Sequence, residues 1–172
     1  FMSIPKTKRK KITINGERVV LADYSASQAN VLYRYVTGEF LHPEDPYKVD
    51  GLHRDTVKHL MKMMLNNGSR KSASGAARSN LNELSRKAAE RFELDSQKHG
   101  GVASMMRLVE ERNAAIAECF YQGKAQGQYY AWLESNLVFE VAKHLSDQGV
   151  PVLTVHDEFI VPTSMEIAVL GC

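Results

Sequence analysis

The stretch 153-LTVHDEFIVP-162 places a histidine and two acidic residues in the middle of an otherwise apolar, β-forming segment. The residues on both sides favour β-strands, so the pattern predicts a hairpin whose turn lies at His156, Asp157 and Glu158. Two-residue turns prefer glycine because their central residues need positive φ, although histidine and aspartate tolerate that conformation better than most residues. Two interpretations remain open: a solvated acidic tip, or side chains retained at the turn for chemistry.

A second hairpin is predicted near the N-terminus. Residues 12-ITINGERVVLA-22 hold the pair Asn15-Gly16 between two short β-forming segments, which is a strong turn signal. The second of these strands leads directly to Asp23. If the two hairpins pair within one sheet, Asp23 and Asp157 are brought together from distant parts of the chain.

Between the hairpins the sequence predicts helices. Ser25 followed by Gln28 is a capping-box pattern, which predicts a helix that begins at Ser25. Apolar residues at helical spacing predict further helices over 53–67, 80–97, 104–121 and 129–146. Residues 38–51 are predicted to form a loop, and the small, basic stretch 69–80 to be mobile. The order of elements predicts an α+β fold, with one small antiparallel sheet made from the two hairpins and packed with several helices.

Some apolar residues are assigned to the core at this stage. The seven methionines are expected to fill helix interfaces. On the predicted 129–146 helix, the residues expected in the core are Trp132, Leu133, Leu137, Val138 and Val141.

Length and composition narrow the class of protein. With 172 residues, 44% of them hydrophobic and 24% charged, the chain is long enough for one domain with a proper core. No apolar run approaches the roughly eighteen residues of a membrane span. The two cysteines form neither a disulfide framework nor a zinc pattern, so we expect a reducing cytoplasm and no membrane partner. The first residue is Phe1 and not Met, which indicates a fragment, a trimmed chain or a residue left by cloning.

Charge is unevenly distributed along the chain. Residues 1–18 carry six Lys and Arg side chains against one acidic residue, and residues 69–91 carry six against two. The remainder is therefore acidic, since the net charge is only +2. Separate basic and acidic zones fit a protein that binds a polyanion with some parts and metal cations with others. For the N-terminal zone, a solvated or localising tail is the alternative.

Two carboxylates held at rigid strand ends also match a specific chemistry. A pair of Mg²⁺ ions about 4 Å apart needs such carboxylates, because Mg²⁺ takes oxygen ligands and retains water. Asp23 and Asp157 would meet this need if the hairpins pair.

Three stretches, taken in order, resemble motifs A, B and C of the family A DNA polymerases, the DNA polymerase I family. They are LADYSASQANVLY at 21–33, RDTVKHLMKMMLNNGS at 54–69 and VLTVHDEFIV at 152–161. The run LESNLVFEVAKHLSDQGVPVLTVHD at 133–157 also resembles the palm helix and hairpin of single-subunit phage-type RNA polymerases. The resemblance implies a polymerase palm with reduced fingers.

The resemblance also implies a division of the chain. Residues 1–50 would form the N-terminal part of the palm, with motif A and a basic arm at 6–11. Residues 51–103 would form a fingers-like helical segment with motif B, and residues 104–172 the palm helices and the motif C hairpin.

Roles at the metal site follow from the same resemblance. Asp23 and Asp157 would bind two Mg²⁺ ions, for which Mn²⁺ is a substitute, and Tyr24 would contribute its backbone carbonyl. Together with Glu158, the two aspartates would form the catalytic set. His156 would contact the primer end.

Nucleotide binding is assigned to the predicted fingers helix. Arg54, Lys58 and Lys62 recur every four residues and therefore share one helix face, which suits a triphosphate. A solvated basic flank is the alternative. Gln28 stands where the family has Glu, and Asn66 or Asn67 where it has a stacking aromatic residue. These departures predict weakened discrimination between deoxyribonucleotides and ribonucleotides.

Contacts to the primer–template complete the set of expected site residues. They are assigned to Lys8, Arg9, Lys10, Lys11, Glu134 and Ser135. The expected partners are a primer–template nucleic acid, nucleoside triphosphates and replication proteins that supply the missing thumb and exonuclease functions.

The leading hypothesis is therefore a template-directed nucleotidyltransferase, a DNA-directed DNA polymerase that works by two-metal-ion catalysis in a bacterial or phage-infected cytoplasm. The alternatives are a phage-type DNA-directed RNA polymerase relative and a non-catalytic nucleic-acid-binding palm domain.

Overall fold

The computed structural model describes residues 4–39 and 44–167. The chain divides into two compact units, one formed by residues 1–27 with 132–172 and the other by residues 28–131. The boundaries between the units reflect compactness alone. They do not test the functional division of the chain at residues 50 and 103, which stays a prediction. Each unit is described separately below.

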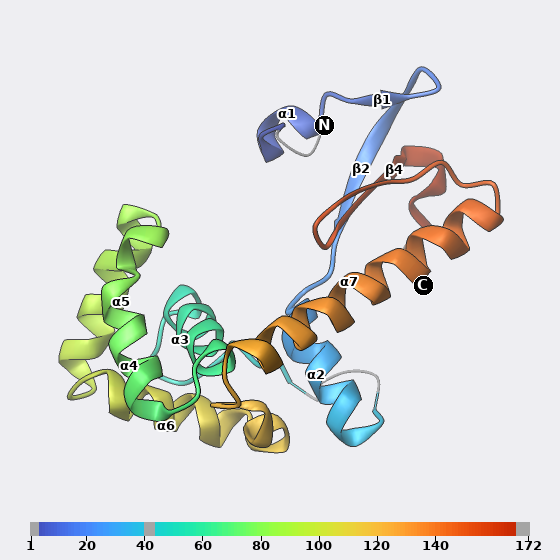
Figure 1. Ribbon diagram of the computed structural model, residues 1–172. Helices are drawn as coiled ribbons and strands as arrows, with labels where there is room; N and C mark the ends of the chain where they lie inside the picture. Colours follow the sequence, from blue (N-terminus) through green and yellow to red (C-terminus); the bar gives the residue numbers. More distant parts are fainter. Residues whose placement is uncertain (1–3, 40–43, 168–172) are drawn as a thin grey trace. The chain divides into compact units, whose positions relative to one another are not determined.

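The first unit is built on one antiparallel sheet (Figure 1). Its strands are β1 (Thr13–Ile14), β2 (Glu17–Asp23), β3 (Leu153–Val155) and β4 (Glu158–Pro162), in the order β1-β2-β4-β3. The two predicted hairpins therefore pair through β2 and β4, and the predicted α+β fold is confirmed. A short N-terminal helix, α1 (Lys6–Arg9), precedes the sheet, and a 3₁₀ segment at Thr163–Met165 follows it.

Both hairpin turns contain two residues. In the first, Asn15 and Gly16 have φ of 54° and 80°, as the sequence pattern predicts. In the second, Val155 pairs with Glu158, and His156 takes the positive φ of 56° that glycine would adopt more readily. Left-handed backbone costs a non-glycine residue roughly 1–2 kcal/mol. The turn therefore keeps an imidazole at a position where glycine would fold more easily.

One face of the sheet packs against helix α7 (Lys124–Asp147). Phe159 and Val161 of β4 form a buried cluster with Val141 and Leu145 of α7. Burial of a side chain of this size stabilises the fold by about 1.5–3 kcal/mol. Since side chains alternate along a strand, residues next to Phe159 in β4 point to the opposite face.

Several predictions for α7 are wrong. The helix begins at Lys124, five residues before the predicted start, and Gly127 lies inside it. A Cβ atom on Gly127 would lie 2.8 Å from the carbonyl oxygen of Leu65, so this glycine permits close packing and does not break the helix. Trp132 and Leu137 are 54% and 42% exposed, whereas Val141 is buried as predicted.

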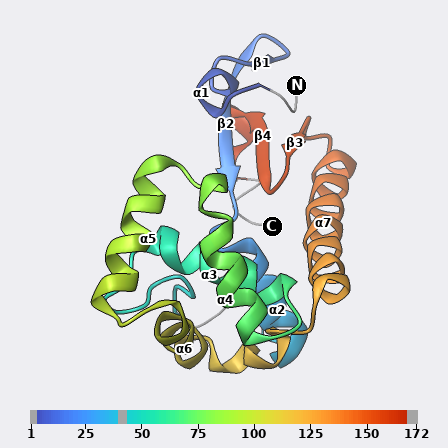
Figure 2. The ribbon, with the colours of Figure 1, turned by 60° about the vertical axis from the view of Figure 1, so that its left-hand side comes forward.

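The second unit is helical (Figure 2). It holds α2 (Ser27–Thr37), α3 (Arg54–Asn66), α4 (Arg70–Ser79), α5 (Arg86–Lys98) and α6 (Val102–Arg112), with 3₁₀ segments at Leu81–Glu83 and Ala114–Cys119. The helix α3 contacts α4, α5 and α6 and supplies much of the core. Five of the seven methionines are buried in this unit as predicted: Met61, Met63, Met64, Met105 and Met106. Met165 is 38% exposed, against the prediction, and Met2 lies outside the described residues.

Three sequence-based predictions for this unit are corrected. The helix predicted over 104–121 ends at Arg112, and Ala114–Cys119 form a 3₁₀ segment. Residues 69–80, predicted to be mobile, form α4, because Ser69 Oγ accepts a hydrogen bond from Ser72 N at 3.1 Å and caps the helix. Ala73 and Ala77 are fully buried, so α4 is held by close packing of small residues. Helix α2 begins at Ser27 and not at Ser25.

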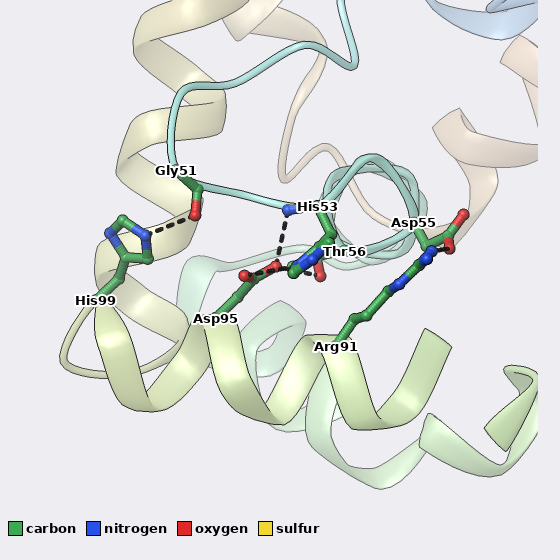
Figure 3. Close-up of polar contacts among 7 residues, drawn as sticks. All are labelled: Gly51, His53, Asp55, Thr56, Arg91, Asp95 and His99. Atoms are coloured by element: carbon green, nitrogen blue, oxygen red, sulfur yellow. Dashed lines mark hydrogen bonds and ion pairs between the residues drawn. The ribbon is translucent and has the colours of Figure 1, made fainter. Parts of the chain in front are cut away.

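A buried carboxylate joins α5 to the start of α3 (Figure 3). Asp95 accepts hydrogen bonds from His53 N at 2.9 Å, from His53 Nδ1 at 2.9 Å and from Thr56 Oγ1 at 2.6 Å. Arg91 of the same helix binds Asp55 at 2.7 Å. Asp95 therefore caps α3 from a neighbouring helix, where anions are stabilised.

Candidate functional site

The main-chain register of the sheet brings acidic residues of the two predicted hairpins together. Asp23, the last residue of β2, is the cross-strand partner of Glu158, the first residue of β4. Directly opposed residues in an antiparallel pair have Cα atoms roughly 4.5–5.5 Å apart. Asp157 precedes Glu158 in the turn, so three acidic residues from the two hairpins lie at one end of the sheet.

The carboxylate of Asp157 contacts a residue that the sequence interpretation did not assign. Ser27 Oγ lies 3.3 Å from Asp157 Oδ2 and is also hydrogen-bonded to Glu134 Oε1 of α7. A hydroxyl group has only one proton to donate, so both contacts can be satisfied together when Glu134 carries a proton. Ser27 therefore links the motif C aspartate to a second carboxylate.

The environment of Glu134 favours its protonated form. Burial raises the pKa of the Glu134 carboxyl, the Ser27 hydrogen bond lowers it, and the nearby charge of Asp157 raises it again. The net direction is upward. Glu134, predicted to contact the primer–template, thus lies within the hydrogen-bonded surroundings of Asp157. Its role toward nucleic acid stays a prediction, as does that of Ser135, which is exposed on α7.

Glu158 is held by the N-terminal segment. Its side chain is 4% exposed, and its Oε1 accepts a hydrogen bond from Arg9 Nη1 at 2.8 Å. Arg9 is itself fixed, because its Nε donates to the carbonyl oxygen of Ile4 at 2.8 Å. Of the four basic residues predicted to contact the primer–template, Arg9 is hydrogen-bonded to Glu158. The other three, Lys8, Lys10 and Lys11, are exposed.

Tyr24 and His156 occupy different environments. The ring of Tyr24 packs edge-on against Phe159, with centroids 5.6 Å apart, and belongs to the core beneath the sheet. The resemblance to motif A assigns the backbone carbonyl of Tyr24 to the metal site. The packing of the ring does not test that assignment, which stays a prediction. His156 is exposed at the turn, and its contact with a primer end stays a prediction.

The predicted Mg²⁺ site depends on two carboxylates, and metal binding by them stays a prediction. Asp23 is exposed and Asp157 half-buried, and both offer carboxylate oxygens, which Mg²⁺ prefers. Within residues 4–39 and 44–167, no group of three or more His, Cys, Asp or Glu side chains is arranged to hold a metal ion. An ion bound by two carboxylates would complete its shell with water or substrate oxygens, as Mg²⁺ commonly does.

In the second unit, the predicted basic stripe lies on the exposed face of α3. Arg54 Cζ and Lys58 Nζ lie 4.9 Å and 5.4 Å from the centre of the Tyr47 ring, which holds both cations on one side. Lys62 binds Glu83 at 2.7 Å, and Arg54 lies 3.4 Å from Asp45. Exposed pairs of this kind contribute about 0–1 kcal/mol, so an anionic ligand can replace the acidic partners.

The remaining predicted nucleotide-binding residues lie at helix ends: Asn66 and Asn67 at the end of α3, and Gln28 at the start of α2. Asn66 Nδ2 and Asn67 Nδ2 donate to the carbonyl oxygens of Lys62 and Met63, each at 2.8 Å, and thereby satisfy the last turn of α3. Gln28 is the second residue of α2 and is half-buried. Their contact with a nucleotide stays a prediction.

Comparison with known proteins returned no relative. No protein-family model matches the chain, and no curated protein or solved structure shows significant similarity to it. Among the described residues, none of the helices combines the length and the apolar character needed to span a bilayer.

Proposed function

We propose that this chain is a template-directed nucleotidyltransferase that extends a nucleic-acid 3′ end, related to the family A DNA polymerases. The observation that carries the proposal is the β2–β4 register, which sets Asp23 opposite Glu158 and next to Asp157. Two sequence motifs that the family uses together are thus joined in one sheet although they lie far apart in the chain.

The reaction forms a bond between the 3′ oxygen and the α-phosphorus of a nucleoside triphosphate and breaks the bond from that phosphorus to pyrophosphate. Two Mg²⁺ ions would supply Lewis-acid activation of the hydroxyl group and stabilise the charge on the phosphate oxygens. Asp23 and Asp157 would hold the cations through carboxylate oxygens. Ser27 orients the Asp157 carboxylate through the 3.3 Å contact, which fixes one donor before substrate binds.

The exposed stripe on α3 provides the binding surface for the triphosphate. Arg54 and Lys58 are pre-positioned over the Tyr47 ring, and Tyr47 is itself buried to 9% exposure. Cations held in place before binding lose less conformational entropy when a phosphate arrives. Lys62 extends the stripe by one turn once it releases Glu83.

The direct test is primer extension on a primed DNA template with Mg²⁺, with deoxyribonucleotides and ribonucleotides offered separately. Wild type is compared with Asp157→Ala and with Asp147→Ala, a matched control in which an exposed aspartate on α7 loses its pairing with Lys143. Template-dependent extension that disappears in Asp157→Ala and persists in Asp147→Ala supports the proposal. Absence of extension by folded wild type that still binds the primer–template would instead indicate a non-catalytic palm domain.

A phage-type DNA-directed RNA polymerase is the second candidate. The observation that favours it is at the end of α3, where Asn66 or Asn67 replaces the stacking aromatic residue of the family and both amides bond to their own helix. The loss of that ring weakens the check on the sugar, so incorporation of ribonucleotides as fast as deoxyribonucleotides would favour this candidate. The proposed partners are the primer–template and replication proteins that add processivity, within a bacterial or phage-infected cytoplasm.

A further inference from the structure

Helix α4 carries three basic residues and no acidic residue among its ten positions. Residues 75 and 78 follow Lys71 at four and seven positions, so Lys71, Gly75 and Arg78 share one face of the helix. All three are exposed, on the side of α4 away from the buried Ala73 and Ala77. The outer face of α4 is therefore basic, and the residue between the two cations has no side chain.

The neighbouring helix α6 extends this basic face (Figure 2). At the start of α4, Arg70 is paired with Glu110 of α6. At its end, a Cβ atom on Gly101 would lie 3.7 Å from Arg78 Nη2. The exposed Arg107 lies three residues before Glu110 and therefore on the same side of α6. Arg107 thus adds a cation on the side of α6 that contacts α4.

We call Lys71, Arg78 and Arg107 the α4–α6 basic surface. Within residues 4–39 and 44–167, none of these three side chains takes part in a hydrogen bond or an ion pair. Five other arginines of the same unit each bind a carboxylate: Arg54, Arg70, Arg86, Arg91 and Arg112. The charge of the α4–α6 basic surface is therefore available to an external anion.

Gly75 is a second feature of this surface. Glycine inside a helix is less stable than alanine, because it loses more conformational freedom on folding. The fold gives no reason for it here, since Gly75 has helical backbone and an added Cβ atom would meet nothing within 4 Å. A glycine on an exposed face lets another backbone approach closely. Cations on both sides of it indicate that the approaching backbone is anionic.

Neither α4 nor α6 contains an aromatic residue. Proteins that bind single-stranded nucleic acid stack its bases on aromatic side chains, so this surface suits the phosphates of a duplex better. Lys71 and Arg78 are seven residues apart, which is about 10 Å along the helix axis. Phosphates of one DNA strand rise about 3.4 Å per nucleotide, so the two cations match phosphates roughly three nucleotides apart.

We propose that the α4–α6 basic surface binds the phosphate backbone of a nucleic-acid duplex without regard to its sequence. Lys71, Arg78 and Arg107 contact phosphates, and Gly75 is the point of closest approach. The surface belongs to the helical unit, whereas Asp23 and Asp157 belong to the other unit. The proposal shares only the nucleic-acid partner with the proposed function, and its test needs neither Mg²⁺ nor nucleotides.

The first experiment measures binding of a labelled DNA duplex by fluorescence anisotropy over a series of salt concentrations. Lys71→Ala/Arg78→Ala should lower the affinity on the order of tenfold to a hundredfold at about 0.1 M salt. The slope of log affinity against log salt should fall by about two, because each phosphate contact contributes about 0.9. The variant should fold, since both side chains are exposed.

The matched control is Lys87→Ala/Lys98→Ala, which removes two exposed lysines from α5 and changes the net charge equally. This control should bind the duplex as wild type does. Equal losses of affinity in the two double variants would show an effect of net charge and overturn the proposal. Unchanged affinity in Lys71→Ala/Arg78→Ala would overturn it as well.

The second experiment tests the close approach without a change of charge. Gly75→Gln places a side chain between the two cations and should weaken duplex binding on the order of tenfold. The control Ala125→Gln alters an exposed position of α7 and should leave the affinity unchanged. Wild-type affinity in a folded Gly75→Gln would contradict a backbone contact at this residue.

The third experiment identifies the ligand. A single strand of the same length and a polyglutamate of the same charge are offered as competitors, and both should displace the duplex poorly. Equal competition by polyglutamate would indicate a surface for acidic peptides, and equal competition by the single strand would remove the preference for a duplex; either result would overturn the proposal. Asp157→Ala should bind the duplex like wild type, so this surface and the proposed catalysis can fail separately.

Discussion

Asp23 and Glu158 are direct cross-strand partners in β2 and β4, and their side chains share the face of the sheet opposite α7. Like charges in this relationship destabilise a sheet by up to about 1 kcal/mol. Arg9 compensates the repulsion by its 2.8 Å contact with Glu158. The Arg9 guanidinium therefore stabilises a concentration of negative charge at this end of the sheet.

Replacement of Asp95 should destabilise the helical unit strongly. Asp95→Ala removes a buried carboxylate that satisfies His53 N and the Thr56 hydroxyl, so donors are left without an acceptor. We expect a loss of about 2–4 kcal/mol in the free energy of unfolding, measured in urea. The control Asp50→Ala alters an exposed loop residue and should change stability by less than about 0.5 kcal/mol. Equal effects of the two substitutions would contradict the capping role.

The same carboxylate predicts a pH dependence. Burial raises the pKa of Asp95, but hydrogen bonds from Thr56 and His53 outweigh it, and the folded-state pKa lies below the ordinary value. A group with a depressed pKa stabilises the fold above its unfolded-state pKa, about 3.9, and loses that contribution as the pH falls further. The stability difference between wild type and Asp95→Asn should therefore shrink as the pH is lowered from 5 to about 2. A difference that grows on acidification would contradict this assignment.

Two glycine substitutions should have opposite effects. Gly127→Ala places a Cβ 2.8 Å from the Leu65 carbonyl oxygen and should cost about 1–3 kcal/mol. Gly75→Ala, on α4, meets nothing within 4 Å and should stabilise the protein by about 0.5–1 kcal/mol. Thermal unfolding of both variants checks the pair. A neutral Gly127→Ala would show that α7 does not approach the end of α3 so closely.

Substitution of His156 separates its backbone role from its side-chain role. The residue has φ of 56°, so the β-branched replacement His156→Val should cost at least about 1 kcal/mol, whereas His156→Gly should leave stability unchanged or slightly higher. Both variants lose the imidazole and should weaken the affinity for primer equally. Unfolding in urea measures the first effect and fluorescence anisotropy with labelled primer–template the second. If folded His156→Gly binds primer–template as tightly as wild type, the predicted contact between His156 and the primer is wrong.

The sheet could be predicted from the sequence because its signals are local. Asn15-Gly16 and the strand pattern around His156 each specify a hairpin within a dozen residues, and the pairing of the two hairpins follows from the need for a common core. Residues 69–80 could not be predicted in this way. Their helix depends on burial of Ala73 and Ala77 against neighbouring helices, which a polar, small-residue composition does not reveal.

The side-chain contacts around the candidate site could not be predicted from the sequence. Arg9 and Glu158 are separated by 149 positions, and Ser27 and Asp157 by 130, so no spacing rule connects them. In the sequence, Arg9 is one of several cations in a basic segment, and no pattern singles out Ser27. Only the packing of α1 and of the start of α2 around the sheet shows which members of each local group contact the acidic residues.

The most direct test of the account is whether Asp23 and Asp157 act as one site. Rates of primer extension with Mg²⁺ are compared for wild type, Asp23→Asn, Asp157→Asn, the double variant and the control Asp147→Asn. We predict that each single variant loses at least about a thousandfold, and that the double variant loses no more, because groups acting as a unit are not additive. Retention of extension in either single variant, or an equal loss in Asp147→Asn, would contradict a shared metal site at this end of the sheet.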